Sequence, residues 1–171
     1  MLRPLDIAVL LKLTLPGAAE SSFQKLASDL HVASSEVHGA VRRARLSGLM
    51  QHDGPKKVNR SALLELLAHG MRYVYPAVRG ELTRGVATSF AAEPLRSVIH
   101  DSGAEVPVWP YVLGKVRGYS FEPIYKHAAE AALADPALYE LLSLVDALRD
   151  GRVRERKIAL EMMSKRLLEN G

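Results

Sequence analysis

The chain has no cysteine and no apolar run long enough to span a membrane. The missing cysteine excludes disulfides, thiolate zinc sites, iron–sulfur clusters and a cysteine nucleophile. The first 13 residues, MLRPLDIAVLLKL, are largely apolar but include Asp6 and Lys12, and no small-residue cleavage site follows them. This stretch is too short and too charged to cross a bilayer. We therefore expect a soluble cytoplasmic protein with no membrane partner.

What the chain contains is an ordinary globular composition. Its 171 residues are 48% hydrophobic and 25% charged, and no internal repeat or low-complexity tract is visible. This length predicts one domain, or a small domain with an appendage, and suffices to bury a core. The balance of apolar and charged residues argues against wholesale disorder.

The net charge of +4 is unevenly distributed along the chain. Residues 1–80 contain 11 Lys or Arg and 6 Asp or Glu, whereas residues 81–171 contain 12 and 13. The first half thus carries +5 and the second half −1. A basic N-terminal half suggests a polyanionic partner, although chance asymmetry on a solvated surface would give the same counts.

The first half predicts four helices and a short hairpin. Pro4 suits a first helical position, the spacing of Ser21 and Gln24 fits a capping box, and Gly48 suits a C-cap. The Asp53-Gly54 pair signals a tight turn, and Asn59 or Ser61 suits the cap of the fourth helix. The predicted elements are helices over residues 4–15, 22–30 and 34–47, strands over 49–51 and 57–58, and a helix ending near Tyr73.

The second half is predicted to be irregular and then helical. Prolines and glycines scattered over residues 76–122 favour extended, irregular structure, with one helical turn near residues 95–100. Asp135-Pro136 is a specific helix-start signal, and Gly151 is expected to end that helix. The remaining helices are expected over residues 123–133 and from Val153 to Leu168.

Residues 22–47 fit a helix-turn-helix. Two amphipathic helices are separated by the short segment 31–33, and a hairpin follows the second helix, as in the winged variety. We therefore predict a mainly α fold with three regions. These are a winged helix-turn-helix DNA-binding domain with a small β-hairpin wing (1–75), an irregular Pro/Gly-rich packing segment (76–122) and a C-terminal helical region for dimerisation or partner binding (123–171).

From Leu2 to Tyr73 the chain resembles the winged helix-turn-helix transcriptional regulators, MarR-like in outline. His31 occupies the turn position at which that family most often has glycine. Residues 72–95, 109–110 and 122–156 more weakly resemble bacterial regulators that continue past a winged domain. Some of those are encoded with nucleotidyltransferase-like toxins and act as antitoxins and autorepressors.

The third helix would be the recognition helix. If Val37, Ala40, Val41 and Ala44 face inward, the opposite face presents polar groups to the major groove. Base readout is expected from Ser35, His38, Gly39 and Arg42. Arg42 can donate a fork to guanine, and Gly39 would allow close approach at a cost of about 1 kcal/mol in helix stability. Backbone contacts are expected from Ser34, Arg43, Arg45, Lys56, Lys57 and Arg60. The alternative is a solvated basic face.

No catalytic, metal or cofactor site is predicted. The six histidines show no metal-ligand spacing, and the segment 85–89 lacks the Gly-Lys-Ser/Thr ending of a phosphate loop. Trp109 suits a packing anchor, with a ligand pocket as the other interpretation. The second basic cluster, 149–157, alternates with acids and fits a mixed-charge face, further phosphate contacts or a salt-bridged dimer seam.

The leading functional hypothesis is a sequence-specific DNA-binding transcriptional regulator, a repressor that binds double-stranded DNA as a homodimer. The candidate dimer seam comprises Leu138, Leu141, Leu142, Val145 and Leu148, which burial within one monomer explains equally well. The alternative hypothesis is an antitoxin or protein-binding adaptor that neutralises a partner enzyme such as a nucleotidyltransferase-like toxin.

Overall fold

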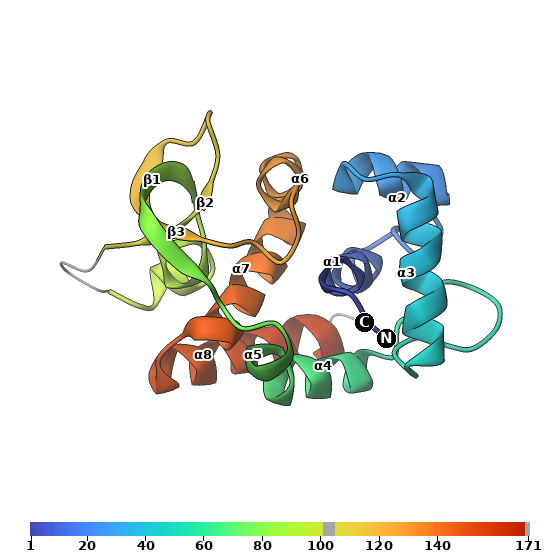
Figure 1. The fold of residues 1–171 in the computed structure, drawn as a ribbon. Coiled ribbons are helices and arrows are strands. Elements are labelled where there is room, and N and C mark those ends of the chain that lie inside the picture. Colours follow the sequence, from blue (N-terminus) through green and yellow to red (C-terminus); the bar gives the residue numbers. More distant parts are fainter. Residues whose placement is uncertain (101–104, 170–171) are drawn as a thin grey trace.

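A computed structural model describes residues 1–100 and 105–169. Within these ranges the fold is mixed, with eight α-helices and a small three-stranded sheet (Figure 1). The helices are α1 (Pro4–Leu13), α2 (Phe23–Leu30), α3 (Ser34–Leu46), α4 (Arg60–His69), α5 (Met71–Val74), α6 (Ala128–Ala134), α7 (Pro136–Asp150) and α8 (Val153–Ser164). The strands are β1 (Arg79–Ala87), β2 (Pro107–Pro110) and β3 (Val116–Phe121). Short turns of other helix types are η1 (Ser89–Ala91), η2 (Leu95–Ser97) and η3 (Lys165–Glu169).

The predicted helices of the first half form, with small changes at their ends. The first helix starts at Pro4 as expected and ends at Leu13, two residues early. The cap of α2 is Ser22 and not Ser21, because the Ser22 side chain accepts the amide hydrogen bond of Lys25. Asn59 caps α4 by accepting from Ala62 N at 3.1 Å.

The wing is a long loop held by very little strand pairing. Met50 and Val58 form one antiparallel bridge, and the Gln51 amide donates to the Lys57 carbonyl at 3.0 Å. Gly54 has a φ of +83°, which agrees with the turn expected at Asp53-Gly54. The two stub strands predicted here are thus reduced to a single bridge.

The prediction of an irregular middle segment is wrong. The three strands of this segment build a closed sheet in which β1 pairs antiparallel with both β2 and β3, while β2 and β3 run parallel. Glycine permits this closure: a Cβ on Gly85 or Gly118 would lie 2.0 Å from a backbone carbonyl oxygen of a neighbouring segment. In the sequence these glycines indicate loops. In the structure they are required because two backbones approach each other closely. The helical turn expected near residue 95 is present as η2.

A buried polar centre joins this barrel to α7. The carboxylate of Asp146 accepts from the Trp109 indole, the Thr88 hydroxyl and the Arg149 guanidinium, each at 2.7 Å. Arg149 also donates to three backbone carbonyls, including that of Tyr75 at 2.8 Å. Burial raises the pKa of Asp146. Arg149 and the hydrogen bonds lower this pKa, but burial has the larger effect. Trp109 is therefore a packing anchor, and Arg149 belongs to the core and not to a basic surface.

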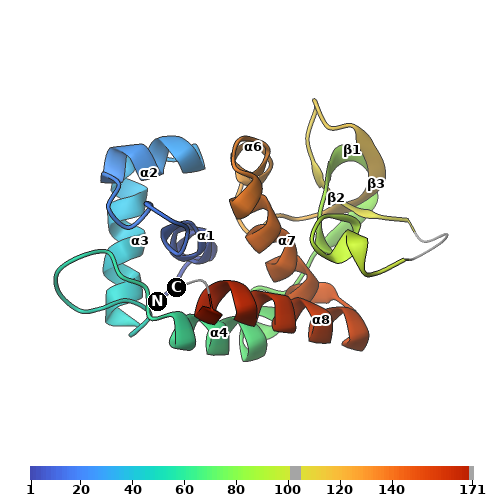
Figure 2. The same ribbon diagram turned by 180° about the vertical axis from the view of Figure 1, so that it is seen from behind.

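The C-terminal helices follow their predicted signals. The Asp135 side chain caps α7 by accepting from Leu138 N at 3.2 Å, and Gly151 ends the helix. The helix expected over residues 123–133 begins only at Ala128, and the last α-helix ends at Ser164. Figure 2 shows α8 running beside α4, which brings the C-terminal end of the chain to the first half.

The candidate dimer seam on α7 is wrong. Its five residues are at most 4% exposed within a single chain. They pack in the main hydrophobic core with α1, α2 and α6. A side chain that is fully covered by its own chain contributes no area to a subunit interface. The seam residues are Leu138, Leu141, Leu142, Val145 and Leu148.

No helix within residues 1–100 and 105–169 is both long enough and apolar enough to cross a membrane.

Candidate nucleic-acid interface

The turn between α2 and α3 has the left-handed backbone that a helix-turn-helix requires. His31 adopts φ 55° and ψ 40°, and its amide donates to the carbonyls at the end of α2. Val32 N donates to Ala27 O at 3.0 Å and completes the closure. A non-glycine residue is uncommon in this conformation, and histidine is among the types that tolerate it better. The chain therefore makes the tight turn without glycine.

One face of α3 is buried against the neighbouring helices. Val37, Ala40, Val41 and Ala44 are buried and pack with apolar residues of α1 and α2. Their spacing at i, i+3, i+4 and i+7 matches one side of a helix. The opposite side is consequently left toward solvent, as the sequence predicted.

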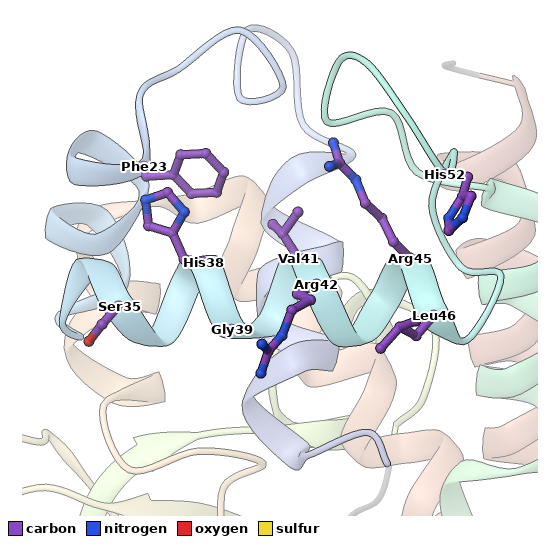
Figure 3. Close-up of a pocket in the computed structure, with 9 residues that line it drawn as sticks. All are labelled: Phe23, Ser35, His38, Gly39, Val41, Arg42, Arg45, Leu46 and His52. Atoms are coloured by element: carbon purple, nitrogen blue, oxygen red, sulfur yellow. The ribbon is translucent and has the colours of Figure 1, made fainter.

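The exposed face of α3 carries the residues expected to read bases. Ser35, His38 and Arg42 are exposed and Gly39 is half-buried beside them. Figure 3 labels all four on the same helix, where they line an open hollow. Arg42 has no ion-pair partner among the residues that the structure describes. Ser34, at the first turn, is half-buried.

Arg43 does not lie on this face. Its guanidinium forms two hydrogen bonds with the fully buried carboxylate of Asp6 on α1, Nε–Oδ2 at 2.8 Å and Nη2–Oδ1 at 2.7 Å. These bonds raise the pKa of Arg43. Gly39 leaves room for the pair, because a Cβ there would lie 3.0 Å from Arg43 Nη1. Arg43 therefore joins α3 to α1. This position does not support the DNA-backbone contact that the sequence predicted for Arg43.

Two further arginines are held by backbone carbonyls. Arg45 Nη2 donates to Gly54 O at 2.8 Å and so ties the wing loop to α3. Arg60 donates to Thr14 O at 2.8 Å and to Leu167 O at 3.2 Å. Arg60 thus joins α4 to the end of α1 and to η3, which removes it from the expected phosphate contacts. Arg45 borders the hollow but acts first as a support for the wing.

The two lysines of the wing loop, Lys56 and Lys57, lie near α3 and the start of α2. Lys57 is exposed, and the Lys56 ammonium lies 5.0 Å from the centroid of the Phe23 ring. The same ring stacks on His38 with a centroid separation of 3.7 Å and an interplanar angle of 18°. Phe23 thereby joins the start of α2, the middle of α3 and the wing. A ring that stacks on His38 also restricts the orientation of the imidazole.

The hollow between α3 and the wing has a volume of about 740 Å³. It is lined by five of the predicted residues: the base-readout candidates Ser35, His38, Gly39 and Arg42, and the backbone-contact candidate Arg45. Sequence reasoning missed Phe23, Leu46 and His52, which also line it. Leu46 is 76% exposed and lies four residues after Arg42, on the same side of α3 as Ser35 and Gly39. This helical spacing could have identified it from the sequence. Phe23 and His52 come from other elements and carry no such signal.

The residues of the hollow can donate hydrogen bonds and offer apolar contact, but they include no acid. Among the residues that the structure describes, no group of three or more His, Cys, Asp or Glu side chains is placed to hold a metal ion. The chemistry available here is thus recognition of an electron-rich surface by Arg, His and Ser.

Comparisons of the chain with protein-family models, with curated proteins and with solved structures find no match. The resemblance to winged regulators therefore stays a prediction from the residues themselves.

Proposed function

We propose that this protein binds duplex DNA sequence-specifically through α3 and regulates transcription, as a repressor. The observation that carries the proposal is the exposed row of Ser35, His38 and Arg42 on a helix preceded by a left-handed turn and flanked by a basic wing. A helix of 13 residues is about 20 Å long. An α-helix of this kind enters the major groove of B-DNA, which is about 12 Å wide.

The base contacts follow from the side chains on that row. Arg42 donates two hydrogen bonds to guanine O6 and N7, and His38 and Ser35 donate to neighbouring acceptors. The exposed Leu46 offers the apolar contact that recognises a thymine methyl group. Phe23 holds His38 in place before DNA arrives, which reduces the ordering cost of binding.

Phosphate contacts come from the wing and from the start of α3. Lys56 and Lys57 lie on the loop next to the helix, and the hydroxyl of Ser34 sits at the N-terminal end of α3, where backbone amides favour anions. Such contacts position the protein on the duplex without reading sequence.

The test is selection of bound fragments from a random duplex library, followed by anisotropy titrations at two salt concentrations. We expect one enriched motif and an affinity that falls steeply as salt rises, because neutralised phosphates release counterions. A slope of log K against log[salt] of about −2 to −3 would correspond to two or three phosphates. No binding at about 50 mM salt, which is below the physiological ionic strength of about 0.15 M, would contradict the proposal and favour the protein-binding adaptor.

The dimeric form of the proposal is tested by the symmetry of the selected sites. Two recognition helices related by a two-fold axis require inverted half-sites centred about 34–36 Å apart. Since the α7 leucines are buried, such a dimer has to use another surface. Enrichment of single, non-repeated half-sites would indicate a monomer on DNA.

A further inference from the structure

A second hollow is lined by residues of the barrel, α6 and α7. The barrel lies at the opposite end of the molecule from α3 (Figures 1 and 2). We call this hollow the barrel cleft. Its volume is about 710 Å³, within the range of sites for small organic ligands. A smaller cavity of about 340 Å³ adjoins it and shares Ala87, Ala91, Arg96 and Val116 with it. None of these residues contributes to the proposed DNA-binding face.

The walls of the barrel cleft are mainly apolar and small. Ala87, Ala91 and Val116 line both cavities, and Leu133 of α6 borders the cleft. Tyr139 closes one side. Its hydroxyl donates to Ala87 O at 2.5 Å, and its ring packs 5.7 Å from that of Trp109, centroid to centroid. A fixed aromatic wall opposite small side chains suits a flat or chain-like apolar body.

The apolar rim of the cleft is exposed. Leu113, on the loop between β2 and β3, is 74% exposed, and Leu133 is 54% exposed. Both residues line the cleft. Large apolar side chains at the mouth of a hollow gain contact area when an apolar ligand enters it.

The charges at the cleft are positive on balance. Arg96 and Lys115 line it, and neither forms an ion pair within residues 1–100 and 105–169. Of the two acids that line it, Glu140 is paired with Arg166, which donates to it at 2.6 Å, whereas Glu93 accepts only from the neutral Ser97 hydroxyl at 2.7 Å and keeps its charge. Arg96 also borders the smaller cavity, so one cation faces both spaces.

From these observations we propose that the barrel cleft binds a small amphipathic carboxylate. Its acyl or aryl body lies against Ala87, Ala91, Val116 and Tyr139, and its carboxylate is bound by Arg96 with support from Lys115. An arginine fork matches a carboxylate in geometry, and hydrogen bonds to charged groups are the stronger ones. The proposal does not depend on DNA binding.

The test uses decanoate as the probe and the full chain as the protein. Trp109 is the single tryptophan, and it packs on the cleft wall, so its emission reports this end of the molecule. We expect saturable binding of decanoate near one equivalent, followed by Trp109 fluorescence and by calorimetry. Decan-1-ol, which has the same chain without the charge, should bind at least severalfold more weakly.

Variants locate the site. Arg96→Gln should weaken decanoate binding about tenfold, the loss expected for a hydrogen-bonded charge. Ala91→Phe places a ring in the space that both cavities share and should weaken decanoate binding strongly. Arg117→Gln changes another exposed arginine, outside the cleft, and should leave the affinity within twofold. Circular dichroism checks that each variant is folded. Absence of decanoate binding by the folded wild type, or equal affinity in wild type and Arg96→Gln, would overturn the proposal.

Discussion

At the scale of the residue, three arginines within four positions of α3 have three different environments. Arg42 is exposed, Arg43 pairs with the buried Asp6, and Arg45 donates to the Gly54 carbonyl of the wing. Successive helical residues point about 100° apart, so adjacent arginines cannot share one partner surface. Of the three, only Arg42 is exposed, and the proposed base contact is therefore assigned to it.

Changing Arg42 to Ala should therefore reduce affinity for the selected DNA site by about 1–3 kcal/mol and relax the preference at one base pair. The measurement is anisotropy on the site and on variants of each base pair. Arg154→Ala, on the exposed part of α8, is the matched control and should leave the preference unchanged. An unaltered base preference in Arg42→Ala would refute its role in base readout.

Changing Asp6 to Asn should instead lower the stability of the protein. Asp6 is fully buried, and its charge is balanced by the two hydrogen bonds from Arg43. Removing one member of a buried ion pair leaves the other uncompensated, at a cost of about 3–5 kcal/mol. Urea denaturation measures this loss. The double variant with Arg43→Met should recover part of it, and additive losses would argue against coupling.

At the scale of the element, the barrel strands depend on residues that have no strand preference. β2 begins and ends with proline, and β1 and β3 each carry glycine where another backbone crosses closely. A Cβ at Gly118 would meet the Val106 carbonyl oxygen at 2.0 Å, and backbone atoms have little freedom to move away.

Gly118→Ala should consequently destabilise the protein by about 1–3 kcal/mol or more, the cost of overpacking. Gly80→Ala in β1 is the control, because its Cβ would meet only the side chain of Ser120, at 3.2 Å. Denaturation followed by Trp109 fluorescence compares the two. Equal stability of both variants would show that the strands accommodate a Cβ at Gly118.

At the scale of the whole molecule, charged side chains join the two halves. Lys12 of α1 contacts Asp29 of α2 at 3.2 Å and Asp135, the cap of α7, at 2.7 Å. Arg149 of α7 reaches the carbonyls of Tyr75 and Pro76 across the expected boundary after residue 75. Helices α2 and α3 thus rest on the same packed body as the barrel cleft.

Lys12→Met should lower stability by about 1 kcal/mol near pH 7, with a defined pH dependence. Burial alone would raise the pKa of Asp29, but hydrogen bonds from Lys25 and Lys12 outweigh it and keep this pKa below the usual 3.8. A lowered carboxyl pKa contributes stability above 3.8 that is lost as the pH falls through the folded value. Burial lowers the pKa of Lys12, but its carboxylate partners raise it above 10.5, so its contribution is present below 10.5 and lost at higher pH.

Thermal unfolding at several pH values measures the difference between wild type and Lys12→Met. The difference should be largest on the plateau between these limits and shrink on acidification. Lys157→Met, an exposed lysine of α8, should show no such profile. A difference that stays constant down to pH values well below 3.8 would contradict the Lys12 bridge.

Most of the helices and several of their ends could be predicted from the sequence because their signals are local. The Asp135-Pro136 start, the Gly151 end, the left-handed turn at His31 and the apolar face of α3 all act within a few residues. The candidate row of Ser35, His38 and Arg42 followed from the same periodicity. The exposure of these three side chains agrees with the structure, while their role in base readout stays a proposal.

Only the tertiary structure decided which charged residues pair within the protein and which glycines are required by close backbone contacts. The Asp6–Arg43 pair, the contacts of Arg60 and the glycines of the barrel depend on segments 37 to 107 residues apart or on backbones that cross after folding. No local pattern contains that information, since burial and partner choice are set when the elements pack. The sequence by itself determined a helical chain with a basic first half and no cysteine chemistry. Packing determined that one arginine of the three on α3 faces outward without an acid, and that the proline- and glycine-rich segment closes into a barrel.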